Sequence, residues 1–122
     1  NELELISEDP DLLGEFHKDG DFIMDDLNVN VLRLNANGLS KFYLKGKAFN
    51  AHFGAADGDV RMETGELEVQ NLFIFHRSTN KMIVNPIQSI QGKIIGLGDV
   101  IAKNHPPIVE VEELFTGKLI FE

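Results

Sequence analysis

Short strand-like segments recur along the chain, each introduced by a turn residue. The clearest units are Gly20-Asp21-Phe22-Ile23-Met24, Gly58-Asp59-Val60-Arg61-Met62 and Gly98-Asp99-Val100-Ile101-Ala102. The first apolar residues of all the units, which we call anchors, lie 18 to 22 positions apart and are Leu3, Phe22, Phe42, Val60, Met82, Val100 and Leu119. This period is too short for helical repeats of ~33–47 residues or propeller blades of ~40. It is typical of a solenoid built from short strands.

Two further columns of the repeat support this interpretation. The residues that precede each anchor by two positions all tolerate turn geometry, and they are Asn1, Gly20, Ser40, Gly58, Asn80, Gly98 and Gly117. The residues two positions after each anchor are all apolar, and they are Leu5, Met24, Leu44, Met62, Val84, Ala102 and Phe121. Because strand side chains alternate between faces, the anchors and this second set share one face and form interior ladders when coils stack.

We therefore predict an all-β fold, a single-stranded parallel β-helix of about six to seven coils of ~19 residues. The whole chain, residues 1–122, forms one domain. Residues 1–18 are expected to form an N-terminal coil or cap, and residues 19–122 to form the repeat coils.

Charged residues alternate in sign along the predicted coils. The column before the anchors alternates from Asp21 onward and reads Glu2, Asp21, Lys41, Asp59, Lys81, Asp99 and Lys118. A second, mostly alternating column reads Asp25, Lys45, Glu63, Asn85, Lys103 and Glu122. Neighbouring coils lie ~4.8 Å apart, so opposite charges in one column attract and like charges repel. We expect these charges to hold the coils in register.

The column directly after the anchors faces solvent in this alignment, although most of its members are apolar. From Ile23 onward this candidate contact surface comprises Ile23, Tyr43, Arg61, Ile83, Ile101 and Ile120. Exposed apolar stripes usually mark contact surfaces, which predicts a protein partner, a second copy of the chain, or a glycan or lipid. Two alternatives stay open: another segment covers the column, or strand propensity alone selects Ile and Tyr there.

Composition excludes several classes of function. The chain has 20 acidic and 11 basic residues, a net charge of −9, which disfavours nucleic-acid partners. It has no cysteine, which excludes disulfides, thiol catalysis and Cys-ligated zinc. No run reaches the ~18 apolar residues of a membrane helix. The chain begins at Asn1, and we expect any export signal to lie upstream.

The repeat resembles a known bacterial family, most specifically in the stretch Ile90-Gln91-Gly92-Lys93-Ile94-Ile95-Gly96-Leu97-Gly98-Asp99-Val100 and in Gly117-Lys118-Leu119. With its Gly-Asp-apolar units, the chain from about Asp19 to the end is similar to the auto-transporter adhesin head GIN domain family. Ser40-Lys41 and Asn80-Lys81 depart from the family's Gly-Asp pattern. The resemblance implies a right-handed parallel β-helix at the bacterial envelope or surface, with no catalytic residues.

No constellation in the sequence indicates catalysis, a metal site or a cofactor. The histidines, His17, His52, His76 and His105, lack metal-ligand spacing, and we expect surface or turn positions for them. Adjacent acidic residues such as Asp25-Asp26 are interpreted as surface charge. The predicted function is a non-enzymatic envelope module for adhesin-like binding. The alternatives are a carbohydrate-active β-helix protein and a structural scaffold that assembles copies.

Overall fold

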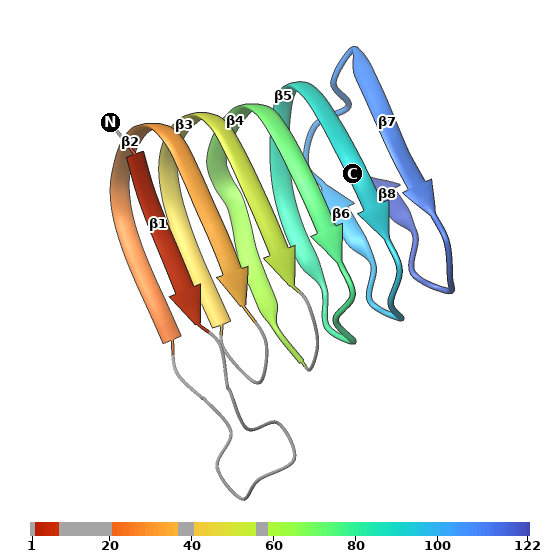
Figure 1. Ribbon diagram of the computed structural model, residues 1–122. Helices are drawn as coiled ribbons and strands as arrows, with labels where there is room; N and C mark the ends of the chain where they lie inside the picture. The colour runs from red at the N-terminus through yellow and green to blue at the C-terminus, as the bar shows by residue number, and fades with distance from the viewer. Residues whose placement is uncertain (1, 8–20, 37–40, 56–58) are drawn as a thin grey trace, which may run out of the picture.

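The computed structural model describes residues 2–7, 21–36, 41–55 and 59–122, and this part of the chain is built of β-strands. The strands are β1 (Glu2–Ser7), β2 (Asp21–Ala36), β3 (Lys41–Ala55), β4 (Arg61–His76), β5 (Met82–Ile94), β6 (Val100–Ala102), β7 (Ile108–Glu113) and β8 (Leu119–Phe121). All the strand pairs are parallel, and β1 to β6 lie side by side in the order of the sequence, while β7 pairs with β5 and β8 pairs with β6 (Figure 1).

The molecule is a β-solenoid of about five turns with about 19 residues per turn. Each of the strands β2, β3, β4 and β5 bends through one coil, β6 and β7 together form the next, and β8 pairs with β6. The parallel β-helix predicted from the repeat is confirmed, but the count of six to seven coils is too high. The reason lies at the ends, where β1 and β8 each supply only part of a coil.

Of the six steps between successive predicted anchors, three are confirmed and three are wrong. Phe22 pairs with Phe42 and stacks on it, with ring centroids 4.8 Å apart, and Met82, Val100 and Leu119 continue the same column. Leu3 instead pairs with Leu32, in the second half of β2. The segment at residues 2–5 therefore belongs to a different face of the solenoid.

The anchor of the third coil is Met62 and not Val60, because Phe42 pairs with Met62 and Met62 with Met82. Val60 lies before β4 in the turn and is fully buried there. Its amide donates a hydrogen bond to the hydroxyl of Ser78 over 2.9 Å. The segment 58–60 copies the repeat motif, but the coil itself begins two residues later.

The second half of each coil closes the core with its own ladders. Leu32, Ala51, Leu72 and Ile90 are in register and fully buried. The bend between the two halves of β3 requires a glycine: Gly46 has a φ of 131°, and a Cβ there would lie 2.2 Å from the carbonyl oxygen of Leu27. The sharp bend lets one continuous strand supply two walls of the solenoid.

The alternation of charge predicted for two columns is wrong at one coil of the first column and is retained in the second. Lys41 pairs with Arg61 rather than with Asp59, so the alternation predicted for the first column is wrong at that coil. In the second column, Lys45 pairs with Glu66 instead of Glu63, and its Nζ lies 3.0 Å from Oε2 of Glu66. The second column therefore keeps its alternation of charge, with Glu66 in place of Glu63.

Of the predicted N-terminal cap, residues 8–18 lie outside the described part of the chain.

Candidate functional site

The residues predicted as a contact surface lie in one column of the solenoid wall, with Glu63 in the place predicted for Arg61. Ile23 pairs with Tyr43, Tyr43 with Glu63 and Glu63 with Ile83, and Ile101 and Ile120 complete the column. Arg61, predicted as a member, lies two residues before Glu63 and pairs with Lys41. The error follows from the two-residue shift of the third anchor. Arg61 still reaches the column, since its Nε donates a hydrogen bond to Oε1 of Glu63 over 2.8 Å.

Side-chain exposure varies along this column. Ile23 is 69% exposed and Ile120 is 42% exposed, whereas Tyr43, Ile83 and Ile101 are half-buried. The half-buried members lie in the middle of the solenoid, where side chains from adjacent coils pack against each other. The side chains at the two ends of this column are therefore exposed, and those at its centre are partly covered by their neighbours.

A bulge in β4 interrupts the regular stacking beside this column. Glu63 pairs with Ile83 and Glu68 with Asn85, so four residues of β4 face one residue of β5. At the centre of the bulge, Gly65 carries no side chain, and a Cβ there would lie 3.3 Å from Cγ2 of Ile83 and 3.4 Å from Cγ of Lys103. β-Bulges are often found beside functional sites because they redirect neighbouring side chains.

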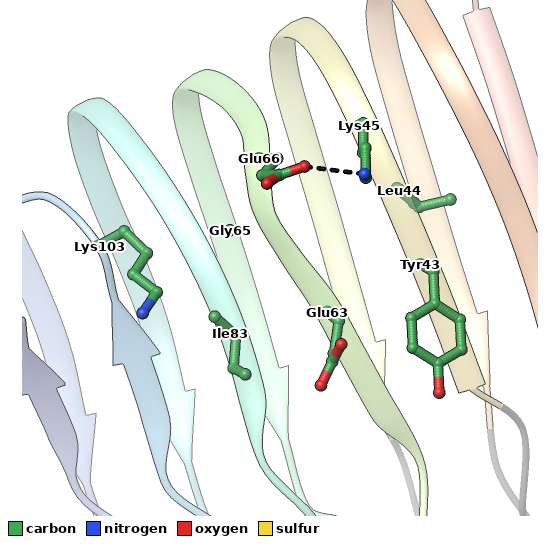
Figure 2. A pocket seen from close by; sticks show the side chains of 8 residues that line it. All are labelled: Tyr43, Leu44, Lys45, Glu63, Gly65, Glu66, Ile83 and Lys103. Atoms are coloured by element: carbon green, nitrogen blue, oxygen red, sulfur yellow. Dashed lines mark ion pairs between the residues drawn. The ribbon is translucent and has the colours of Figure 1, made fainter.

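An open groove of about 670 Å³ lies over this bulge. Figure 2 shows the residues that line it, which come from four successive coils: Tyr43, Leu44, Lys45, Glu63, Gly65, Glu66, Ile83 and Lys103. The ring of Tyr43 and the side chain of Ile83 supply its apolar surface, and lysine and glutamate side chains form its polar part. We call this feature the β4 groove.

The buried Thr64 supports the bulge from inside. It is fully buried at a position where an apolar side chain was predicted, and its Oγ1 donates a hydrogen bond to the carbonyl oxygen of Ile83 over 2.6 Å. The hydroxyl thus joins the irregular segment of β4 to the neighbouring strand β5. The sequence-based alignment placed Met62 at this position and so missed Thr64.

The charges at the β4 groove are arranged in ion pairs. Lys45 pairs with Glu66 over 3.0 Å, and Lys103 pairs with Glu122 over 2.9 Å. The hydrogen bond and negative charge of Glu66, with a smaller contribution from Asp25, raise the pKa of Lys45. Glu63 is paired with Arg61. Each glutamate of the groove therefore has a cationic partner.

Two carboxylates, those of Glu63 and Glu66, lie in the β4 groove, and each contacts a cationic side chain. A glycosidase needs two carboxylates on either side of the scissile bond, one of them with a raised pKa. In the β4 groove, Arg61 donates hydrogen bonds to Glu63, and Lys45 forms an ion pair with Glu66. Within the described residues, no group of three His, Cys, Asp or Glu side chains is placed to hold a metal ion.

The predicted turn residues fall into two groups. Gly20, Ser40 and Gly58 lie outside the described residues. Asn80, Gly98 and Gly117 stack on one another: a Cβ on Gly98 would lie 1.9 Å from the carbonyl oxygen of Asn80, and one on Gly117 would lie 2.2 Å from that of Gly98. The turns approach so closely that only a residue without a side chain fits at the second and third positions.

A second outer face carries aromatic side chains that the sequence analysis did not single out. His52 stacks on Phe73 with ring centroids 5.0 Å apart and an angle of 6° between the planes. Phe73 and Phe75 are 40% and 41% exposed. Their position could have been inferred from strand alternation, because Phe73 and Phe75 flank the inward-facing Ile74.

Of the other histidines, His76 is buried, His105 is exposed, and His17 lies outside the described residues.

The fold and the lateral groove place the molecule among β-solenoid proteins, and comparison with known proteins identifies the family. The model of the family described as "Putative auto-transporter adhesin, head GIN domain" matches residues 2–106, and the chain belongs to this family. The resemblance noted from the repeat is thereby confirmed. No curated protein matches the chain.

One solved structure shares the fold, the crystal structure of a putative adhesin from Bacteroides fragilis NCTC 9343. The two chains are 18% identical and superpose with a TM-score of 0.79 over 98% of this chain. The match covers 53% of the other chain, so this chain spans about half the length of that protein. No helix among the described residues is long and apolar enough to cross a bilayer.

Proposed function

We propose that this domain is a non-enzymatic binding module of the bacterial cell envelope, with the β4 groove as its working surface. Family membership supports the adhesin-like character. The observation that carries the proposal is the groove itself, which lies over the bulge of β4 and combines an aromatic ring, an aliphatic side chain and paired charges. Sites of this composition bind ligands through apolar contact and orient them through a few polar groups.

Adhesion of protein-coated beads tests the proposal. Fluorescent beads carrying the domain are incubated with mucin, extracellular-matrix proteins, and bacterial and epithelial cells, and retained beads are counted. Beads with the wild-type domain are expected to adhere to at least one of these surfaces. Beads with the Tyr43→Ala variant should lose most of that adhesion. Beads with Phe73→Ala, which removes an exposed aromatic ring from another face, should keep it.

Two results would overturn the proposal. One is wild-type beads that adhere to none of the surfaces. The other is equal adhesion of the wild-type and Tyr43→Ala beads. Circular dichroism and thermal unfolding of both variants establish that any loss of adhesion arises in the folded protein.

The non-enzymatic part of the proposal has its own test. The domain is incubated with plant and bacterial polysaccharides, and new reducing ends are measured. We expect no release above that of a Glu63→Gln, Glu66→Gln double variant, because both carboxylates are held by cations. Release by the wild-type domain that the double variant lacks would assign the groove to a carbohydrate-active enzyme.

Self-association is the second candidate function, and one observation favours it. Ile83, Ile101 and Ile120 are in register, and the last of them is 42% exposed. Light scattering after size exclusion, across a wide concentration range, tests this candidate. A mass that rises with concentration and returns to the monomer in Ile101→Ser, Ile120→Ser would support it, and a constant monomer mass would refute it.

A further inference from the structure

The β4 groove has the chemistry of a site for a neutral saccharide. We propose that a short, uncharged oligosaccharide binds there, with one pyranose ring stacked on Tyr43. This inference rests on the proposed function and names the ligand class of the same surface.

The tyrosine ring supplies the apolar contact. Tyr43 is half-buried on the outer face of β3, and Figure 2 shows its ring nearly face-on in the view onto the groove. The face of an aromatic ring is electron-rich, and the axial C–H groups of a pyranose carry a partial positive charge, so the two attract when stacked. The neighbour of Tyr43 in the next coil is Glu63, whose carboxylate lies at the same level of the wall.

The polar groups supply hydrogen bonds for hydroxyls. A carboxylate offers about four acceptor positions and an ammonium group three donors. The pair between Lys45 and Glu66 uses one contact of each group, at 3.0 Å. Each member retains further capacity, so one pair presents a donor and an acceptor side by side. Vicinal hydroxyls of a sugar, which both donate and accept, match such a pair.

The charge balance selects a neutral ligand. The three ion pairs at the groove, Lys45 with Glu66, Arg61 with Glu63, and Lys103 with Glu122, each sum to zero. A sulfate or carboxylate on the ligand would compete with the glutamates for these cations. It would also approach a chain whose net charge is −9. Uronic-acid and sulfated glycans are therefore disfavoured relative to neutral hexoses.

The length of the groove suits more than one sugar ring. Its lining runs from Tyr43 on β3 to Lys103, which directly follows β6. These residues span three coil spacings, or about 14 Å at ~4.8 Å per coil. A chain of linked pyranoses lying along the solenoid axis can contact the tyrosine at one end and the lysine at the other.

A glycan array followed by titration tests the inference. The domain is applied to neutral oligosaccharides of glucose, galactose, mannose and N-acetylglucosamine, and to sulfated and uronic-acid counterparts. We expect binding to at least one neutral oligosaccharide, measured again in solution by calorimetry or NMR. Its affinity should change little between 50 and 500 mM NaCl, since screening acts on charged ligands.

Substitutions at one position separate stacking from other effects. Tyr43→Ala should weaken binding of the array hit by about tenfold or more, because the stacking surface is lost. Tyr43→Phe keeps the ring and should stay within about threefold of the wild type. Phe73→Ala is the matched control on the other face and should bind as the wild type does. Thermal unfolding of each variant verifies that it is folded.

The outcomes are distinguishable from those of the proposed function. The saccharide inference is wrong if no neutral oligosaccharide binds, if only acidic glycans bind in a salt-dependent way, or if Tyr43→Ala binds equally well. If bead adhesion depends on Tyr43 while no neutral saccharide binds, the binding module stands and its ligand is of another class. If bead adhesion is independent of Tyr43, the proposed function itself fails.

Discussion

The Nε2 atom of His76 lies 2.8 Å from the carbonyl oxygen of Asn80, inside the stack of turns that follows β4. A carbonyl only accepts hydrogen bonds, so Nε2 carries the proton and Nδ1 is the bare nitrogen. Nδ1 is buried and has no hydrogen-bond partner in the described part of the chain. Burial lowers the pKa of His76, and the carbonyl of Asn80 and the charge of Asp99 oppose that shift only in part.

This contact predicts a pH dependence of stability. The unfolded chain binds a proton at His76 near pH 6.5, and the folded chain binds it only at lower pH. The contribution of His76 to stability is therefore complete above about pH 6.5 and is lost as the pH falls below it. Urea unfolding between pH 7.5 and 5 should show a stability advantage of the wild type over His76→Gln that shrinks on acidification. Parallel curves for the two proteins would contradict the prediction, and His105→Gln serves as an exposed control.

Gly98→Ala should destabilise the domain strongly. The new Cβ would lie 1.9 Å from the carbonyl oxygen of Asn80, and that backbone atom cannot move without separating two coils. We expect a loss of about 3 kcal/mol in unfolding free energy, measured by urea denaturation. Gly54→Ala is the control, because its Cβ would come closest to the side-chain oxygen of Asn35, at 2.9 Å, and that side chain can rotate away, while the nearest backbone atom, the carbonyl oxygen of Leu34, lies at 3.6 Å. Equal stability of both variants would show that the turns are not closely stacked.

Leu72→Ala tests the ladder in the second half of the coils. Leu72 is fully buried between Ala51 and Ile90, and its truncation leaves a cavity between two coils. The expected cost is about 2–5 kcal/mol. Leu97→Ala removes the same group from a side chain that is 54% exposed and should cost less than about 0.5 kcal/mol. A small effect at Leu72 would be inconsistent with the register described here.

Thr64→Val tests the support of the bulge in β4. The substitution keeps the shape of the side chain and removes the hydroxyl that donates to the carbonyl of Ile83 over 2.6 Å. A loss of about 1 kcal/mol is expected in chemical denaturation. Thr79→Val, whose hydroxyl bonds Asp59 at the surface over 3.1 Å, should have a smaller effect. If Thr64→Val is as stable as the wild type, the hydroxyl does not hold the bulge.

The inward-facing residues were predictable because alternation along a strand is a local property. Phe42, Met82 and Val100 are each followed two positions later by another apolar residue, so both side chains of each pair lie on the same face of their strand. Stacking of the coils is enough to bury that face. The turn residues Gly98 and Gly117 were predictable for a similar reason, since few residue types fit a tight turn.

The coil boundary at β4 was not predictable in the same way. A shift of two residues keeps every side chain on its own face, so Val60 and Met62 satisfy the pattern equally well, and both are buried. Only the pairing of Met62 with Phe42 and Met82 decides between them. The same shift explains why Arg61 was assigned to the contact column in place of Glu63.

By itself, the sequence determined the fold class, the repeat length and most of the outer column, because these follow from which residues alternate and how often. The tertiary structure alone decided the groove. It arises where four residues of β4 face one of β5, and that mismatch depends on the register between two coils. The register between coils also decided that His76 is buried. His76 pairs with Ala55, which pairs with Ala36, and the small side chains of these alanines leave room for an imidazole ring. Pairing between coils is a long-range property, and local patterns along one strand do not encode it uniquely.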